Sequence, residues 1–337
     1  MAPSFSTAQH LLLFSPNWLG DVVMALPAFQ QWRAAHPGRR VTVLAKPGVA
    51  ALWDLVDGVE RIVVLPPGRA GQHEALRTLR ALDCEAALLM PHSFRAGWIA
   101  WRAKVPVRRG TAGQCRGWMI NDPVSLADFQ HQHQQYEGFH LFGLLPDAPP
   151  GAPRLTIPAE SAREVAELAQ LDPTCRYVAL LPGAARGDSK RWPAESFAAA
   201  ARMVSERLPE LRFLVCGTPA EAEVCAAVTA MIGPAAANLA GRTRLPGLAA
   251  LLAQCAAVCS NDSGGMHLAT VVNVPVVAVF GLTDPSRTGP LGCARVIAPS
   301  GVKVSRAIPR HSPEATRALA SIAPERVAEA LLEVLVP

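Results

Sequence analysis

The sequence lacks the motifs that mark several large enzyme classes. Across its 337 residues there is no GxGxxG after an apolar run and no GxxxxGK[ST]. Their absence disfavours a dinucleotide-dependent oxidoreductase and a P-loop NTPase. The nucleophile motif GxSxG is missing too, which disfavours the common serine-hydrolase arrangement. No DxD occurs, so a sugar-diphosphate site bridged by a metal ion is not expected, and we predict neither a metal nor a cofactor.

Long hydrophobic runs and paired cysteines are also missing. The longest apolar runs, such as PVVAVFGL, have the length of a strand and fall short of the ~20 residues of a spanning helix. The N-terminus carries no charged segment followed by a long apolar stretch, so no signal peptide is expected. The 8 cysteines are scattered without a CxxC pair, which favours reduced thiols and a cytoplasmic location. With no aromatic-rich RNA motif or basic repeat, nucleic acid is not an expected partner.

What the sequence does contain is an alternation of strand-like and helix-like segments. Strands are predicted at residues 10–15, 41–45, 61–65 and 86–90 in the first half, and at 177–181, 211–217, 256–261, 275–281 and 294–298 in the second. Near-continuous apolar strands separated by amphipathic helices predict parallel sheets covered on both faces, an α/β fold. The segment 145–158, LPDAPPGAPRLTIP, is rich in Pro and Gly and reads as a linker. We therefore expect two doubly wound domains, residues 1–152 and 153–337. A last helix, Pro324 to Leu335, is a candidate to pack back on the first domain.

Two strand-turn-helix segments carry candidate chemistry. The first, SPNWLGDVVMALPAF, places Asp21 at a predicted helix start. A carboxylate there is most often a helix cap, but in an open turn it can also accept a proton from a hydroxyl group. The second, NDSGGMH, combines Asp262 and the hydroxyl of Ser263 with the bare backbone of Gly264 and Gly265 at another helix start. Free amides and a helix dipole favour an anion such as a phosphate.

The remaining candidates for donor binding lie around these segments. His267 falls in the first turn of the second helix and could contact phosphate or only fix the turn. In PGAARGDSKRWP, Gly183 and Ala184 permit close approach of a ligand, and Lys190 can neutralise a diphosphate leaving group, although an ordinary surface Lys-Arg pair is the alternative. Glu221 stands where a Rossmann-like domain often binds a ribose, but many such residues only complement the helix dipole.

A basic stretch and a histidine-rich stretch remain open to interpretation. Between Arg95 and Arg116 there are six basic residues and no acidic one. The functional interpretation is a surface for an anionic partner such as a phosphorylated lipid, and the alternative is an ordinary solvated face. The segment QHQHQQYEGFH carries His131, His133 and His140, but no further ligand completes a metal site, so an exposed polar helix start is favoured.

Four blocks of the sequence resemble glycosyltransferase family 9, the heptosyltransferases of lipopolysaccharide synthesis. They are SPNWLGDVVMALPAF, MPHSFRAGWIAWRAKVPVRRG, LLPGAARGDSKRWPAESF and NDSGGMHLATVVNVPVVAVFG, and their form is most similar to heptosyltransferase II. The resemblance implies a GT-B fold, two Rossmann-like domains facing across a cleft, and an inverting, metal-independent reaction. Gly265 departs from the family, in which a bulkier apolar residue is usual at this position.

The resemblance also implies roles for individual residues. Asp21 matches the catalytic base, and Lys190 matches the lysine on the donor phosphates. The implied donor site comprises Gly183, Ala184, Lys190, Glu221, Asp262, Ser263, Gly264, Gly265 and His267, and the predicted acceptor site comprises Asn17, Arg95, Arg108 and Arg109.

The implied reaction is transfer of L-glycero-D-manno-heptose from ADP-heptose to the inner core of a Kdo-lipid A type acceptor. It would take place in the cytoplasm, with peripheral contact at the inner face of the inner membrane. Two alternatives stay open: a transferase of the same family that uses another nucleotide sugar, and a non-catalytic sugar-nucleotide or lipid-core binding protein. An NAD oxidoreductase is a remote third.

Overall fold

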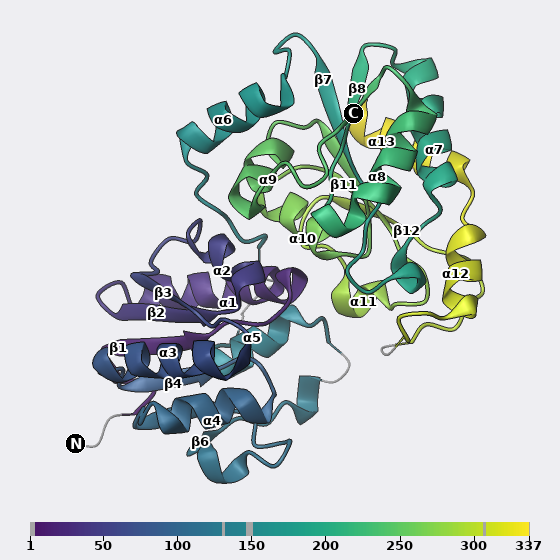
Figure 1. Ribbon diagram of the computed structural model, residues 1–337. Helices are drawn as coiled ribbons and strands as arrows, with labels where there is room; N and C mark the ends of the chain where they lie inside the picture. Colours follow the sequence, from purple (N-terminus) through teal and green to yellow (C-terminus); the bar gives the residue numbers. More distant parts are fainter. Residues whose placement is uncertain (1–3, 130–131, 146–150, 306–307, 337) are drawn as a thin grey trace. The chain divides into compact units, whose positions relative to one another are not determined.

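The chain divides into two α/β units (Figure 1). The computed structural model describes residues 4–129, 132–145, 151–305 and 308–336. Contacts between Cα atoms divide the chain into residues 1–156 and 157–337. The sequence-based prediction places this division after residue 152. In the described residues, no helix combines the length and the hydropathy needed to span a membrane.

The first unit is built on a six-stranded parallel sheet in the order β3-β2-β1-β4-β5-β6. The strands are β1 (His10–Phe14), β2 (Arg40–Ala45), β3 (Arg61–Val64), β4 (Ala86–Leu89), β5 (Val107–Gly110) and β6 (Asp122–Pro123). In register, Leu11 of the central strand lies opposite Val41 on one side and Ala86 on the other. The sequence predicts the first four strands, but it does not predict β5 or β6.

Helices cover both faces of the first sheet because its strands are apolar on both sides. They are α1 (Leu19–Ala35), α2 (Pro47–Trp53), α3 (Gly68–Ala81), α4 (Phe94–Arg102) and α5 (Gln135–Phe142), with the short 3-10 helices η1 (Gly117–Met119) and η2 (Ala127–Phe129). Leu12 and Phe14 pack with side chains of α3 and α4 in one core cluster. Leu11 and Leu13 point to the opposite face because side chains alternate along a strand. Helix α1 packs against α5, where Phe29 and Trp32 contact the ring of Phe142.

The second unit repeats this plan with the order β12-β11-β10-β7-β8-β9, again all parallel. Its strands are β7 (Arg176–Leu181), β8 (Leu211–Val215), β9 (Ala236–Asn238), β10 (Ala257–Asn261), β11 (Val276–Val279) and β12 (Ala294–Ile297). Only the short edge strand β9 escapes prediction. The predicted α/β class with two Rossmann-like sheets is confirmed.

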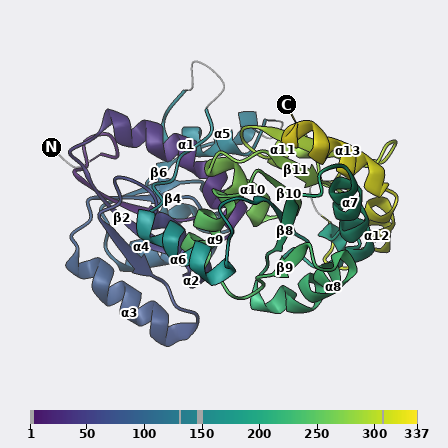
Figure 2. The same cartoon turned by 90° about the horizontal axis from the view of Figure 1, so that it is seen from above.

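The helices of the second unit include one whose place differs from the expectation. They are α6 (Ala159–Ala169), α7 (Ala194–Arg207), α8 (Ala222–Ile232), α9 (Leu245–Leu252), α10 (Gly264–Val271), α11 (Pro285–Thr288), α12 (Pro313–Ala320) and α13 (Pro324–Leu335), with 3-10 turns η3 (Asp188–Lys190) and η4 (Pro219–Glu221). The sequence reading offers α13 as a brace for the first domain. Instead its apolar stripe, Val327, Leu331 and Leu335, joins the core of the second unit, where α13 packs beside α7 and against β10 and β11 (Figure 2). Residues spaced by four share one helix face, and here that face covers the second sheet.

Each sheet has one point where the strand order reverses. The chain starts a sheet at β1, goes outward through β2 and β3, and returns to the other side at β4. In the second sheet the same reversal separates β7 from β10. Ligands of open α/β sheets bind beyond the carboxyl ends of the strands at such points. The loops after β1, β4, β7 and β10 are therefore where functional residues are expected.

Candidate active site

In the second unit, a buried asparagine ties together the loops that follow β7 and η3. Asn261, at the end of β10, has no exposed surface. Its Nδ2 donates to the carbonyl oxygens of Pro182 at 2.7 Å and Gly183 at 3.4 Å, and its Oδ1 accepts the backbone N–H of Trp192 at 2.9 Å. The PGA turn and the KRWP segment, the two ends of the string PGAARGDSKRWP, are thereby fixed to one another. Asn261 is a positioning residue that the sequence-based site does not contain.

Lys190 and Asp262 form an ion pair at this point of the sheet. Both side chains are largely buried, with 17% of the lysine and 7% of the aspartate side chain exposed. A carboxylate paired with an ammonium group fixes the position of that group, while the other N–H bonds of Lys190 can still donate. The structure therefore brings two predicted donor residues together. It makes Asp262 the partner that orients the lysine.

Glu221 lies directly against the turn that contains Gly183. Its Oε2 accepts hydrogen bonds from the backbone N–H and the hydroxyl of Thr218, both at 2.8 Å. A Cβ atom at position 183 would lie 2.1 Å from the Glu221 Cδ. Glycine at 183 thus leaves room for this carboxylate. Ala184 is buried beside it, and its carbonyl accepts from Arg191 Nη2 at 3.3 Å.

The start of α10 presents the expected amides. Ser263 is the N-cap residue, and its hydroxyl makes no capping hydrogen bond but lies 3.3 Å from the hydroxyl of Ser260. The first-turn amides, which include those of Gly264 and Gly265, have no partner within their own helix. A Cβ on Gly265 would lie 2.7 Å from Leu181 Cδ1, so the β7 side chain fills the space that a bulkier residue would need. His267 is only 3% exposed, and this burial favours the interpretation that it fixes the turn.

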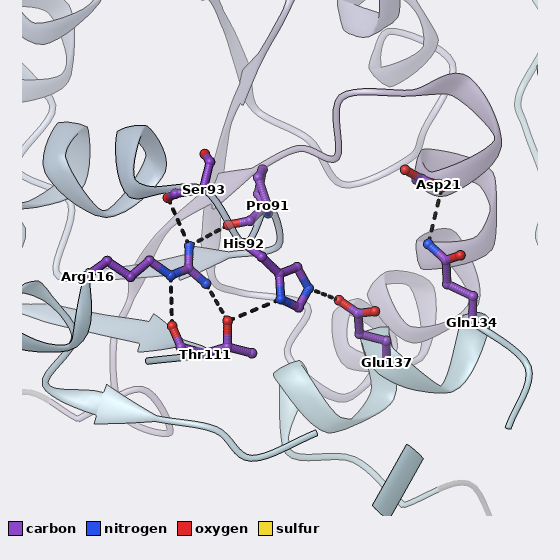
Figure 3. A network of polar contacts seen from close by, with 8 residues as sticks. All are labelled: Asp21, Pro91, His92, Ser93, Thr111, Arg116, Gln134 and Glu137. Carbon is purple, nitrogen blue, oxygen red and sulfur yellow. Dashed lines mark hydrogen bonds and ion pairs between the residues drawn. The ribbon is translucent and has the colours of Figure 1, made fainter. Parts of the chain in front are cut away.

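In the first unit, Asp21 occupies the first turn of α1, directly after β1 (Figure 3). The N-cap residue is Trp18, and Asp21 is half-buried rather than the cap itself. Gln134, at the start of α5, donates from its Nε2 to Asp21 Oδ1 at 3.2 Å. Asn17 lies in the turn between β1 and α1 and is half-buried. The carboxylate is therefore held at the carboxyl edge of the first sheet, beside the switch point.

A hydrogen-bonded chain that the sequence analysis missed lies at the same edge (Figure 3). His92, after β4, pairs through Nε2 with Glu137 of α5 and lies 3.2 Å from the Thr111 hydroxyl through Nδ1. That hydroxyl accepts from Arg116 Nη2 at 2.6 Å. Glu137 and Gln134 lie within one turn of each other on the chain, so α5 contributes to both the Asp21 contact and the His92 contact. The PHSF motif is the only sequence signal for this group.

Arg116 holds the loop that carries His92. Its guanidinium is fully buried and donates to the carbonyls of Thr111, Pro91 and Ser93. In the part of the chain that the structure describes, no carboxylate lies within ion-pair distance of Arg116. Burial lowers the pKa of its guanidinium. Its N–H groups donate to backbone carbonyls and to the Thr111 hydroxyl rather than to a carboxylate. The residue is structural and does not belong to a solvated basic face.

Two predicted acceptor residues also use their guanidinium groups for contacts within the first unit. The Arg108 guanidinium donates to the carbonyls of Met119, Val105 and Pro106, and burial lowers its pKa. Arg109 forms an ion pair with Asp122 at 2.9 Å and donates to the Leu141 carbonyl at 2.6 Å. Arg108 ties β5 to η1, and Arg109 ties it to β6 and α5, which charge alone does not reveal. Arg95 is exposed, and all three arginines stay predicted acceptor residues.

A metal centre finds no support in the described part of the chain. Among those residues, no group of three or more His, Cys, Asp or Glu side chains is placed to hold an ion. His133 lies just before α5, and His140 lies within this helix. His131 lies outside the described residues.

Comparison with known proteins decides the family. The family model "Glycosyltransferase family 9 (heptosyltransferase)" matches residues 73–313, which include the loops after β4, β7, β8 and β10. The chain belongs to glycosyltransferase family 9. As a family 9 member it is a glycosyltransferase, and its two sheets are those of the GT-B fold.

Family 9 relatives match over almost the whole length. Lipooligosaccharide heptosyltransferase 2 of Haemophilus ducreyi is 29% identical, with 97% of this chain and 99% of the relative covered. Lipopolysaccharide heptosyltransferase 2 of Escherichia coli is 28% identical, with 86% and 88% covered. The solved structure of E. coli ADP-heptose lps heptosyltransferase II superposes with a TM-score of 0.84 at 25% identity, covering 97% of this chain and 98% of that one. A family 9 structure from Veillonella parvula, 22% identical with a TM-score of 0.82, has the same fold.

Proposed function

We propose that the protein transfers L-glycero-D-manno-heptose from ADP-heptose to a heptose or Kdo hydroxyl in the inner core of lipopolysaccharide. The observation that carries this proposal is the pairing of two chemically different half-sites. A carboxylate stands at the switch point of one sheet, and a buried lysine with helix amides stands at the switch point of the other. The names of the relatives supply the donor, heptose, and the acceptor class.

The second unit would bind the ADP-sugar. The amides at the start of α10 and the ammonium group of Lys190 suit the diphosphate, since both offer fixed positive charge. Glu221 at the end of η4 would accept from the ribose hydroxyls. Lys190 and the amides provide the charge that a divalent metal provides in other transferases, so we propose a metal-independent reaction whose rate does not change with a chelator. Preorganised charge of this kind is usually the largest catalytic contribution.

The first unit would bind the acceptor and start the reaction. Asp21 takes the proton of the acceptor hydroxyl, and the oxygen forms a bond to C1 of the heptose. The bond from C1 to the phosphate oxygen breaks, and ADP leaves with the electron pair. Direct displacement inverts C1. The reaction requires both half-sites to contact the reacting atoms at once, and exclusion of water at that moment would prevent hydrolysis of the donor.

The cellular setting follows from the substrates. ADP-sugars belong to the cytoplasm, and the acceptor is anchored in a lipid. We therefore propose a cytoplasmic enzyme in peripheral contact with the inner face of the inner membrane.

The test replaces Asp21 with the isosteric, non-basic asparagine. Asp21→Asn should lower kcat by about 100- to 10,000-fold, the usual contribution of general base catalysis, and leave the ADP affinity within about twofold. Initial rates of ADP release with ADP-heptose and a truncated core acceptor measure kcat. Calorimetry with ADP measures the ADP affinity. The matched control is Asp83→Asn, an exposed carboxylate of the same unit.

Two results would count against the proposal. If Asp21→Asn lost ADP affinity and turnover together, Asp21 would act in structure rather than in catalysis. If the native protein bound ADP-heptose and acceptor without releasing ADP, it would be a binding protein.

A further inference from the structure

One face of the first unit exposes large aromatic side chains. Phe94 and Trp101 of α4 are 44% and 41% exposed, and Trp118 of η1 is 63% exposed. The rings of Trp101 and Trp118 meet edge to face with centroids 5.3 Å apart. Helix α4 packs beside β4, β5 and η1 (Figure 1). We call the outward surface formed by Phe94, Trp98, Trp101 and Trp118 the aromatic face.

Helical geometry explains why these rings share a side. Phe94 and Trp101 are seven residues apart, which is two helical turns, so they lie in line along α4. The opposite arc of the helix, Ala96, Ile99 and Ala100, is buried in the core of the unit. Trp98 is half-buried and packs partly against that core. Phe94 and Trp101 are not part of it, and their exposure calls for a different explanation.

Cations accompany the rings along the same side of the helix. Arg95 and Arg102 are exposed, lie seven residues apart, and follow Phe94 and Trp101 by one position each. The guanidinium of Arg102 lies 5.5 Å from the centroid of the Trp98 ring. No acidic residue occurs from Arg95 to Arg116. Lys104, beyond the helix, lines a cavity together with Asp83 and Glu85. It is therefore not counted with Arg95 and Arg102.

We propose that the aromatic face docks on the surface of a membrane that contains anionic lipids. Tryptophan and arginine combine an apolar body with a polar group that prefers the headgroup region, and anionic lipids attract the cations. The face begins at Phe94, directly after the loop that carries His92 at the carboxyl edge of the sheet. Docking there would place the predicted acceptor side next to the bilayer. This inference rests on the proposed function, whose acceptor is anchored in a lipid.

The experiment is flotation of the full-length protein with vesicles, without donor or acceptor. Vesicles of phosphatidylcholine with about one third phosphatidylglycerol should bind the protein, and pure phosphatidylcholine should bind it more weakly. The double variant Trp101→Ala with Trp118→Ala should weaken binding about tenfold or more, since both rings leave the interface. Arg102→Gln should weaken it about fivefold at low salt and less at high salt.

Matched variants and a second readout separate the possible failures. Arg77→Gln removes one exposed cation from α3 of the same unit and should not change flotation. The double tryptophan variant should release ADP at the native rate with a soluble, delipidated acceptor and without vesicles. Loss of that rate in the native protein would refute the proposed function, whereas an intact rate without flotation would refute only the docking face. Equal flotation of the native protein and the double tryptophan variant would also refute the docking face. So would light scattering that shows a dimer for the native protein and a monomer for the double tryptophan variant.

Discussion

Replacing Asn261 should damage both the stability of the second unit and its affinity for nucleotide. The side chain is fully buried and joins the backbone N–H of Trp192 to the carbonyl of Pro182. In Asn261→Ala these two groups lose their partner in a place that water does not reach. A buried unsatisfied backbone group costs about 1–3 kcal/mol, so the pair costs about 2–6 kcal/mol. For a unit of this size, that free energy corresponds to a decrease in Tm of roughly 4 to 24 °C.

The effect on ligand binding follows from the same contacts. Asn261 fixes the Gly183 turn relative to the segment that carries Lys190, so its loss should weaken ADP binding by about tenfold. Thermal unfolding monitored by circular dichroism measures the stability, and calorimetry at a temperature well below the lower Tm measures the affinity. Asn261→Asp keeps an acceptor for Trp192 but cannot donate to Pro182 and buries a charge, so it should be at least as destabilising.

The matched control is Asn238→Ala. This residue lies on the edge strand β9 and accepts one local hydrogen bond from the Ala240 backbone at 3.0 Å. Its replacement should cost about 1 kcal/mol or less and leave ADP binding unchanged. If Asn261→Ala unfolded at the same temperature as this control and bound ADP normally, the assignment of Asn261 as the link between the two turns would be wrong.

Two further predictions concern a glycine and the thiols. Gly183→Ala should weaken ADP binding because its methyl group displaces Glu221. The control Gly48→Ala, where no atom lies within 4 Å of the new Cβ, should leave ADP binding unchanged. Calorimetry with ADP measures both affinities, and equal affinities would contradict the packing argument. All 8 cysteines are free, and a disulfide-exchange reagent at pH 8 should react rapidly with the exposed Cys115 and Cys293. Several other thiols should react only after unfolding, since burial raises their pKa to about 12: Cys84, Cys255 and Cys259. Rapid reaction of more than three thiols in the native protein would refute this burial pattern.

Much of the fold can be predicted because its strands are strongly apolar. Runs such as HLLLF and VVAV are buried on both faces of their sheets, and hydrophobicity alone identifies them. The strands that escape prediction are different. β5 has the sequence VRRG, β6 has two residues, and β9 is a three-residue edge strand. A short strand that is half polar gives no periodic signal, and its place is fixed by pairing with a neighbour.

The site is predictable where chemistry depends on local sequence. The turns at Asp21, Lys190 and Ser263 are each recognised from a strand, a turn and a helix start. The interactions that hold these turns join residues far apart in the chain. Asn261 reaches Gly183 across 78 positions, and His92 meets Glu137 across 45. No local pattern contains such contacts.

The basic stretch shows what charge alone leaves out. The guanidinium groups of Arg108 and Arg109 donate to backbone carbonyls and, for Arg109, to Asp122. How far a cation is engaged within the fold depends on the segments that pack around it. Arg95, Arg102 and Lys104 of the same stretch are exposed.

The most direct test of the central claim is a panel of nucleotide sugars offered to the purified protein with and without a truncated Kdo-lipid A acceptor. Nucleotide release should be fastest with ADP-heptose, should require the acceptor, and should persist in the presence of a chelator. Faster release from another nucleotide sugar, or tight binding of ADP-heptose with no release, would contradict the proposal that this chain transfers heptose from ADP-heptose.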